Sequence, residues 1–275
     1  RDLVRSRGLG DVYKRQAQAD SYASQLMEQY GDTYKANGIG LNTVQRFERI
    51  LIKSSDLLEL VYGVDGETPV SDADLTSHLE NNMYELAYYT IPLYNTSTYA
   101  SADDDQITEM LNLAQSAIDD VNSYAATLAD LSDSTNSSML MGAFSGVVTS
   151  ALPDIYKVLN STYSSDSDAP SLELIGDSTV TSAFTADGAA DTVRSLSIGQ
   201  AAALKYNGYA MMAVLRLDPL SLNSLDNLRT QVLNDMKSEE LTDALAAYGA
   251  SLEHNLSSSA MNRMPASKIV NSSTN

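Results

Sequence analysis

The side chains that most often carry out catalysis or hold metals are scarce in this chain. Among 275 residues it has no cysteine and only two histidines, His78 and His254. The lack of cysteine excludes disulfides, thiolate metal sites and cysteine nucleophiles. The two histidines lie in separate helical patterns, and neither belongs to a spacing that metal ligands use. We expect both to be structural or surface residues, and we predict neither a metal site nor a cofactor.

Two acidic stretches could hold a cation by composition. "SADDDQ" (101–106) is explained better as the acidic start of a helix. "TADGAAD" (185–191) lacks the ligand spacing of a calcium loop. The sequence also contains no glycine-rich dinucleotide loop, no P-loop and no nucleophile elbow.

The net charge of the chain restricts the classes of partner that it can bind. It has 36 acidic and 17 basic residues, which give a formal net charge of −19. A field of that sign repels phosphate backbones and anionic lipids, so we predict no nucleic-acid partner. The longest apolar run, "YAMMAVL" (209–215), is strand-sized and falls short of the roughly 18 residues that a membrane span needs.

The first sixteen residues differ from the rest, because "GDVYKRQ" (10–16) ends a basic head on an acidic chain. Residues 11–16 can be back-translated as GAT GTG TAT AAG AGA CAG, which resembles the end of a transposon used to fragment DNA for sequencing. We therefore interpret residues 1–16 as a translated adapter and set them aside before reasoning about the fold. The native reading then starts near Ala17.

Hydrophobic periodicity predicts a helical N-terminal part. We expect helices over 17–36, 42–62 and 71–82, with Asn42 and Ser71 as N-caps. The character changes at "ELAYYTIPLY" (85–94), which is aromatic and β-rich and is typical of a strand.

The central part mixes helices and strands. Its patterns predict, in order, a helix over 104–131, a loop over 132–138, helical pieces over 139–162 interrupted before Pro153, a strand over 172–177, a helix over 183–196, and strands over 197–207 and 208–218. Asn207-Gly208 predicts a two-residue hairpin between the last two strands. A final helix is expected from Ser221 to His254.

This order predicts an α+β fold in which a helical domain receives an inserted α+β domain and then a returning C-terminal helix. The boundaries that we expect are 17–83 and 219–265 for the helical domain, 84–218 for the insert, and 266–275 for a disordered tail.

Three stretches in this order resemble foldases of the PrsA and SurA type, whose helical chaperone domain carries a parvulin-like prolyl isomerase insert. "VSDADLTSHLENNMYELAYYTIPL" (70–93) is similar to the passage from the helical domain into the first parvulin strand. "DTVRSLSIGQAAALKYNGYAMMAVLRLD" (191–218) is similar to the end of a parvulin domain. "LRTQVLNDMKSEELTDALAAYGASLEHN" (228–255) is similar to the returning helix. The resemblance covers most of residues 40–265.

The resemblance implies an extracytoplasmic foldase that binds unfolded or partly folded polypeptides, needs no small-molecule cofactor and isomerises peptidyl-prolyl bonds. That bond rotation has a barrier of about 18–20 kcal/mol, so it needs a groove that disfavours the planar imide rather than a nucleophile or a metal. The two histidines usual in parvulins are replaced here by Tyr89 and Ala210. The stretch 171–184 keeps only Gly176 and Phe184 of the part that shapes the groove.

We therefore expect a degenerate parvulin-like domain with weak or no isomerase activity, and no catalytic residue beyond the groove positions Tyr89 and Ala210. The substrate-binding candidates are Tyr89, Phe184, Tyr209 and Met211. Two alternatives stay open, namely an active isomerase that works without histidines and a non-catalytic surface or structural helical protein.

The resemblance also implies that the protein is secreted or anchored at the cell surface. Its signal segment, and any membrane anchor, would precede Ala17 in the native chain. Helices lost with that segment would leave an exposed apolar face on the helical domain.

Overall fold

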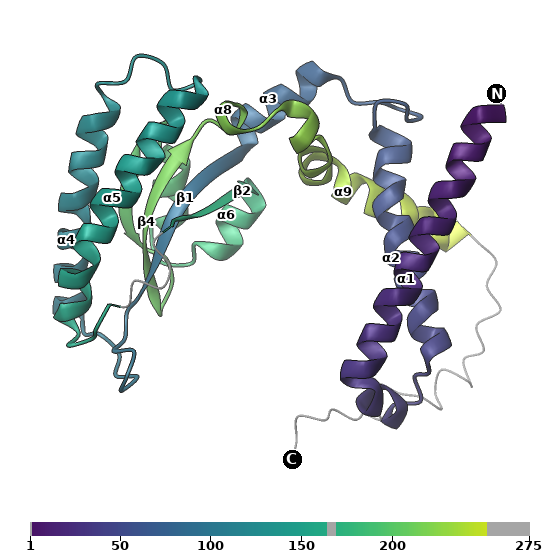
Figure 1. Cartoon of the computed structure of the whole chain (residues 1–275), viewed down its shortest axis with the longest axis horizontal. Helices are drawn as coiled ribbons and strands as arrows, with labels where there is room; N and C mark the ends of the chain where they lie inside the picture. Colours follow the sequence, from purple (N-terminus) through teal and green to yellow (C-terminus); the bar gives the residue numbers. More distant parts are fainter. Residues whose placement is uncertain (1, 164–168, 252–275) are drawn as a thin grey trace. The chain divides into compact units, whose positions relative to one another are not determined.

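The computed structural model describes residues 2–163 and 169–251, with side chains described from Gln16 onward except at 53–55. The described residues form an α+β fold of helices and one antiparallel sheet of four strands (Figure 1). The chain divides into two compact units, residues 1–70 with 236–275, and residues 71–235. We call them the helical unit and the sheet unit. The sheet unit also takes in residues 71–83 and 219–235, which we had assigned to the helical domain.

The helical unit is built on a hairpin of two helices, α1 (Asp2–Ala36) and α2 (Leu41–Tyr62). The turn between them uses Gly38 with a positive φ of 72°, a conformation that glycine adopts without steric cost. Helix α2 begins after Gly40, so Asn42 lies inside the helix and is not its N-cap.

Helix α1 starts fifteen residues before the helix that we predicted from Ala17. The backbone of the basic head from Asp2 onward is therefore part of this helix. The side chains of residues 1–15, including Val12 and Tyr13, lie outside the described residues. The same holds for His254 and for the tail over 266–275, so the structure does not bear on those predictions.

Few of the described apolar side chains of the helical unit are buried. The buried ones are Ala19, Ala23, Val44, Leu58 and Tyr62, whereas five large apolar side chains of α2 are exposed, Leu41 and Leu60 among them. The other three are Phe47, Ile50 and Leu51, with exposed fractions of 58%, 60% and 47%. Their spacing of three and four residues puts them on one side of the helix, so this unit presents an apolar helix face.

The sheet unit is centred on a long strand, β1 (Met83–Pro92). Its strand order is β2-β1-β4-β3, with β2 (Ser171–Gly176), β3 (Ala201–Lys205) and β4 (Ala210–Leu217). All neighbours are antiparallel, and β1 pairs with β4 over 85–92 but with β2 only over 83–88. Among the described residues, no strand pairs with the last four residues of β1 on the side away from β4.

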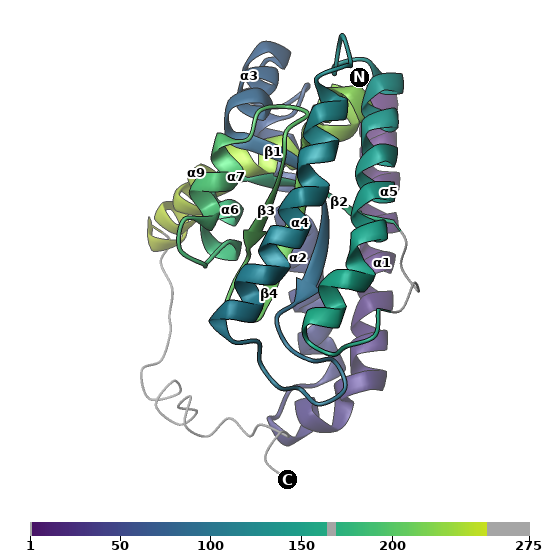
Figure 2. The same ribbon diagram turned by 90° about the vertical axis from the view of Figure 1, so that its left-hand side faces the viewer.

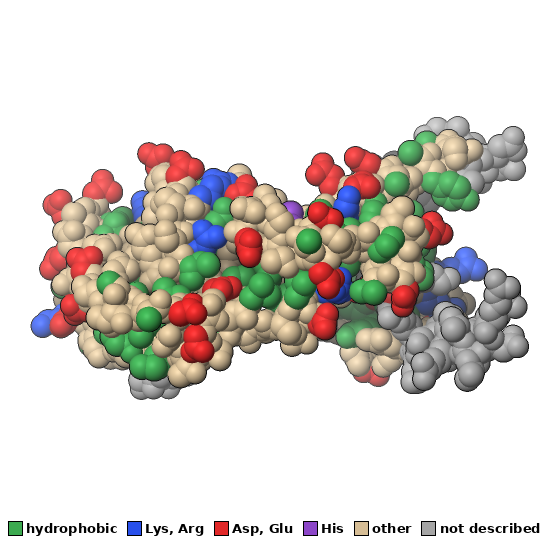
Figure 3. All heavy atoms as spheres, turned by 90° about the horizontal axis from the view of Figure 1, so that it is seen from above, with side chains coloured by type: hydrophobic (Ala, Val, Ile, Leu, Met, Phe, Trp, Pro, Cys, Tyr) green, Lys and Arg blue, Asp and Glu red, His purple; other side chains and the backbone are tan. Residues whose placement is uncertain are grey.

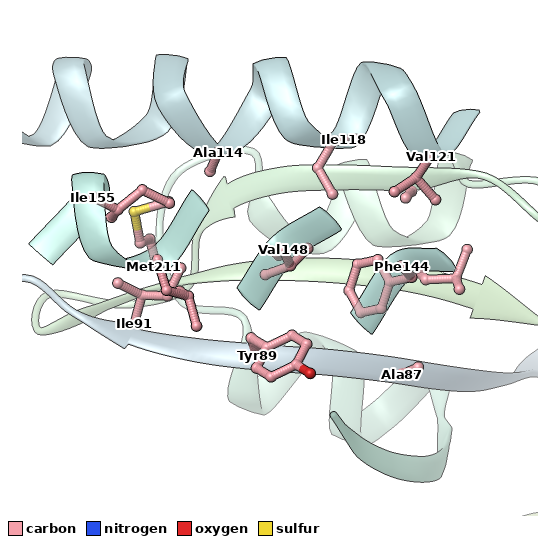
Figure 4. Close-up of a cluster of buried hydrophobic side chains, with 14 of the residues drawn as sticks. Ala87, Tyr89, Ile91, Ala114, Ile118, Val121, Phe144, Val148, Ile155 and Met211 are labelled. Carbon is pink, nitrogen blue, oxygen red and sulfur yellow. The ribbon is translucent and has the colours of Figure 1, made fainter. Parts of the chain in front are cut away.

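One face of the sheet is covered by α4 (Asp104–Ala125) and α5 (Ser134–Val158), as Figure 2 shows. Figure 4 shows how Tyr89 and Ile91 of β1 point toward Phe144 and Val148 of α5. The main core fills this layer, because apolar side chains at helical spacing meet alternate residues of the strands.

The other face is covered by two short helices, α6 (Asp177–Ala183) and α7 (Ala189–Ser195). A second core lies here and includes Leu86, Val180, Phe184, Val193, Leu196 and Val214. Asp177 accepts hydrogen bonds from Arg194 at 2.6 and 3.2 Å, which ties the start of α6 to the end of α7. This ion pair links the two helices that cover this face of the sheet.

Three further helices are α3 (Asp72–Asn82), α8 (Pro219–Leu222) and α9 (Leu225–Ser251). Ser71 caps α3 as predicted, since its side chain accepts the backbone N–H of Asp74. Within the sheet unit, His78 of α3 contacts Asp235 of α9 at 2.8 Å, so this histidine has a structural contact with a carboxylate.

Helix α5 differs from the broken helix that we predicted, because Pro153 lies inside it. The proline removes one helical N–H, yet it lies on the exposed side of the helix. The opposite side buries Leu152 and Ile155, and this packing holds the helix together through the proline. The helix also starts at Ser134, capped by Asp133, where we expected a loop.

The β3–β4 hairpin forms, but its loop has four residues, 206–209, and not two. The Asn207 side chain accepts the N–H groups of Tyr209 and Ala210 at 2.8 and 2.9 Å. Gly208 does not take a positive φ, so the turn is not the type that Asn-Gly most favours.

The outer edge of β3 is closed by side chains of α4. Asn122 donates to the Ala201 carbonyl at 3.1 Å and accepts its N–H at 2.8 Å. Gln115 accepts the N–H of Ala203 at 3.4 Å. These amides satisfy backbone groups that an edge strand otherwise leaves unpaired.

Two glycines differ in the space that is available for a side chain. Gly199 has a φ of 82°, and an added Cβ would overlap the Leu131 side chain. Gly142, in the exposed side of α5, has nothing within 4 Å of the place a Cβ would take.

Helix α5 is, among the described residues, the one helix long and apolar enough to cross a membrane. Its inner side supplies Leu140, Phe144 and Val148 to the main core, as a core helix of a water-soluble fold also would.

Candidate functional site

The sheet face under α6 and α7 contains a small hollow with a volume of about 150 Å³. It is lined by Leu86, Tyr88, Glu173, Ile175, Thr179, Ala183, Phe184, Tyr206 and Met212. We call it the first hollow. Its walls come from three strands and α6, so the sheet and the helix position the lining side chains together.

Aromatic rings dominate the first hollow. The Phe184 and Tyr206 rings meet edge to face, with centroids 5.1 Å apart. At the rim, the Tyr88 hydroxyl donates to the Glu173 carboxylate at 3.1 Å. Burial, and then the nearby Glu173 charge, raise the pKa of Tyr88, which keeps its hydroxyl protonated as a donor.

A second hollow, of about 270 Å³, lies where β2 begins beside β1. Its lining is rich in tyrosine and consists of Tyr88, Tyr89, Thr90, Leu152, Tyr156, Tyr163, Ala169 and Ser171. The Tyr156 and Tyr163 rings lie 5.5 Å apart. Tyr88 lines both hollows, so the two meet at the same point of β1.

The sequence-predicted site residues do not come together in one groove. Of the substrate-binding candidates, only Phe184 lines the first hollow. Tyr89 points to the opposite face, where its hydroxyl shares a hydrogen bond of 2.8 Å with Ser145 and its ring lies 5.8 Å from Phe144. Met211 is fully buried in the main core on that face.

The remaining two candidates also lie elsewhere. Ala210 is buried at the start of β4, opposite Pro92. Tyr89 pairs with Ala213, and Ala210 lies three positions before Ala213 in β4. Because an odd separation along a strand reverses the face, Tyr89 and Ala210 face opposite sides of the sheet. Tyr209 is 76% exposed in the hairpin loop and does not line either hollow.

The residues that line the first hollow are the neighbours of the predicted ones, Tyr88 in place of Tyr89 and Met212 in place of Met211. A shift of one residue moves a strand side chain to the other face. Both faces of β1 are apolar, so alternation in the sequence does not tell which face packs under the long helices. Tyr206 was missed because we had placed it in a strand with no role at the groove.

One unusual titratable group lies apart from both hollows. Glu85 of β1 is 3% exposed, with Leu174 and Leu217 as its strand neighbours. Its Oε2 atom has no hydrogen-bond partner among the described residues. Burial raises the pKa of Glu85 to about 7. This carboxyl is a local cost to the fold at alkaline pH, since an ionised carboxylate there lacks solvation.

The described part of the chain offers no cluster of three His, Asp or Glu side chains arranged as metal ligands. Carboxylates are spread over the face of the molecule that Figure 3 shows. The first hollow presents aromatic rings, apolar side chains, one carboxylate and two phenols. This arrangement suits contact with apolar groups and hydrogen-bond acceptors.

Comparison with protein-family profiles, with curated proteins and with solved structures gave no match for this chain.

Proposed function

We propose that the protein is an extracytoplasmic foldase or chaperone that binds unfolded exported proteins, with a parvulin-like sheet unit of weak or no prolyl isomerase activity. The observation that carries this proposal is the first hollow. Pockets for drug-sized ligands usually have volumes of about 300–1,000 Å³. A hollow of about 150 Å³ takes one apolar side chain of a larger ligand, which favours a polypeptide over a small molecule.

The apolar face of α2 supports the same proposal. Phe47, Ile50 and Leu51 expose about half or more of their surface in a chain with a net charge of −19. Exposed apolar side chains grouped on a helix are typical of surfaces that bind other polypeptides. A surrounding negative charge keeps such a protein soluble while the apolar face stays available.

The order of elements in the sheet unit supports the parvulin-like part of the proposal. Its elements are, in order, a strand, two long helices, a short strand, two short helices and a hairpin, and the stretches that resemble parvulins lie in the first strand, the second short helix and the hairpin. We assign weak or no isomerase activity because the first hollow holds no histidine and because Tyr89 lies on the opposite face of the sheet.

Binding of a permanently unfolded protein tests the proposal. Reduced and carboxymethylated α-lactalbumin, labelled with a fluorophore, should bind the intact chain, and the chain should slow aggregation of a denatured client. We expect Phe184→Leu to weaken binding by about three- to tenfold, because it removes an aromatic contact in the hollow. Tyr209→Ala, which removes an exposed ring of the hairpin, is the matched control.

Thermal melting of both variants separates lost binding from lost folding. Absence of binding to the unfolded protein by the wild type, together with normal aggregation of the client, would refute a chaperone function. A protease-coupled assay on a proline-containing peptide decides the isomerase question. We expect rates near the uncatalysed ones, and a large acceleration would support the alternative of an active isomerase.

A further inference from the structure

Three aromatic rings and one carboxylate line the first hollow together. The rings belong to Tyr88, Phe184 and Tyr206, and the carboxylate is that of Glu173. The face of an aromatic ring is negative, so it attracts a positively charged group that lies over it. Sites that recognise ammonium groups are commonly built from several such rings. The lining of the first hollow therefore favours a cation over an anion.

The sheet register places the carboxylate beside an aromatic ring. Glu173 of β2 pairs with Leu86 of β1, and residues that pair directly project their side chains to the same face. Tyr88 lies two positions after Leu86 in the strand and therefore projects to this face as well. From there its hydroxyl donates to the Oε2 atom of Glu173 at 3.1 Å. Two neighbouring strands thus hold the negative rim next to the aromatic lining.

The contact with Tyr88 leaves the rim able to bind a further donor. A carboxylate has about four lone-pair sites, so Glu173 can accept hydrogen bonds from a ligand in addition to the one from Tyr88. Burial, and then the Glu173 charge, raise the pKa of Tyr88, so the phenol stays neutral and adds no charge of its own. Glu173 is exposed to solvent, and a ligand that enters the hollow can therefore reach it.

Two arginines of the same layer show how cations are held on this side of the sheet. The Arg216 guanidinium lies 4.7 Å from the centre of the Tyr84 ring and donates to the Leu196 carbonyl at 2.6 Å. Arg194 pairs with Asp177 at 2.6 Å. Neither of these two arginines lines the first hollow. Contact between a cation and an aromatic ring is therefore already part of this layer, next to the hollow that has three such rings.

Apolar side chains form the rest of the lining, and they suit the stem of a long cationic side chain. They are those of Leu86, Ile175, Ala183 and Met212. Lysine and arginine bury their methylene stems along apolar surfaces and keep the charged head near water. Such a side chain uses the apolar lining, the rings and the carboxylate together, whereas a leucine or phenylalanine side chain would leave Glu173 without a partner from the ligand.

We propose that the first hollow accepts a Lys or Arg side chain of an unfolded polypeptide, with the stem against the apolar lining and the cationic head among the aromatic rings and Glu173. The inference rests on the proposed function and narrows the ligand from an apolar side chain in general to one whose apolar stem ends in a cation. A polypeptide is the source, because about 150 Å³ holds a single side chain and the net charge of −19 attracts basic segments.

Matched peptides separate the charge of the ligand from its apolar contact. The probes are peptides Gly-Ser-Thr-Xaa-Thr-Ser-Gly that carry the same neutral fluorophore, with Lys, norleucine, Arg or citrulline as Xaa. Norleucine keeps the lysine stem without its charge, and citrulline is the neutral analogue of arginine. Binding is measured at about 0.15 M salt, where charges more than about 8 Å apart are largely screened. We expect the intact chain to bind each cationic peptide about tenfold more tightly than its neutral partner.

Two substitutions locate this preference. Glu173→Gln removes the charge of the rim and keeps its shape, so the preference for the cationic peptides should fall to about threefold or less while the norleucine peptide binds as before. Glu109→Gln removes an exposed carboxylate of α4 and is the matched control for net charge, so it should keep the tenfold preference of the wild type. Thermal melting shows that both variants fold.

Three outcomes would overturn the inference. The first is equal binding of the cationic and neutral peptides by the wild type. The second is an equal fall in preference in both variants, which would show that net charge alone attracts the peptides. The third is displacement of the Lys peptide by an equal concentration of tetramethylammonium, which would identify a small ammonium compound as the ligand.

The chaperone function is judged separately from the cation site. Binding of unfolded α-lactalbumin by a wild type that shows no preference among the peptides would refute the cation site and leave the chaperone function standing. A tenfold preference for the cationic peptides without binding of unfolded α-lactalbumin would refute the chaperone function and support the cation site.

Discussion

Replacing Glu85 by glutamine should stabilise the sheet unit at alkaline pH. Burial raises the pKa of this carboxyl from 4.5 to about 7 in the folded protein. A folded-state pKa above the unfolded value favours folding when the group is protonated, so this contribution is complete below about pH 4.5 and is lost as the pH rises through about 7. The shift corresponds to about 3 kcal/mol of unfolding free energy.

The assay is urea-dependent hydrogen exchange of the β4 amides, which reports unfolding of the sheet unit alone. The unfolding free energy of Glu85→Gln minus that of the wild type should rise by about 3 kcal/mol between about pH 4 and about pH 8. Glu109→Gln removes an exposed carboxylate of α4 and is the matched control for the change in net charge. A difference that does not change with pH, or that falls as pH rises, would refute the argument.

Four further substitutions test the packing. Tyr89→Phe should cost about 1 kcal/mol of stability through the lost hydrogen bond to the α5 serine without weakening unfolded-protein binding; weaker binding at unchanged stability would return Tyr89 to the site. In thermal melting, Gly199→Ala should destabilise the protein by about 1–2 kcal/mol or more, whereas Gly142→Ala should stabilise it by about 0.5–1 kcal/mol. A stabilising Gly199→Ala together with a destabilising Gly142→Ala would contradict the conformations assigned to these two glycines. Asn122→Ala should cost about 1–3 kcal/mol and increase aggregation measured by light scattering, because Ala201 loses both side-chain partners; an unchanged melting temperature and monomer would contradict the edge-closing role.

Most elements were predictable because their signals are local. Ser71 before an acidic first turn marks the start of α3, and the β-rich composition of residues 85–94 marks β1. The errors arose where tertiary packing outweighs a local preference. Pro153 stays inside α5 because the opposite side of the helix is buried against the sheet. Helix α6 was missed because seven residues carry too little periodicity to be recognised.

The candidate site was predicted only in part, for a different physical reason. The sequence placed aromatic and methionine side chains on the right strands, and Phe184 on the right wall. The sequence did not determine, for two adjacent strand residues, which one faces α4 and α5 and which one faces α6 and α7. The reason is that β1 and β4 are apolar on both faces. That choice depends on where α4 and α5 pack. Glu85 likewise looked like an ordinary strand residue, since its burial comes from elements distant in sequence.

The side-chain amides on the edge of β3 have a consequence for assembly between molecules. Fibrils grow through sheets only when each molecule offers two pairing edges, one to accept a neighbour and one to recruit the next. Asn122 and Gln115 occupy one of those edges. With this edge occupied, two molecules could pair only through the β2 side of their sheets, so the association would stop at a pair. By closing one edge of its sheet, the chain loses the capacity for unlimited polymerisation through that sheet.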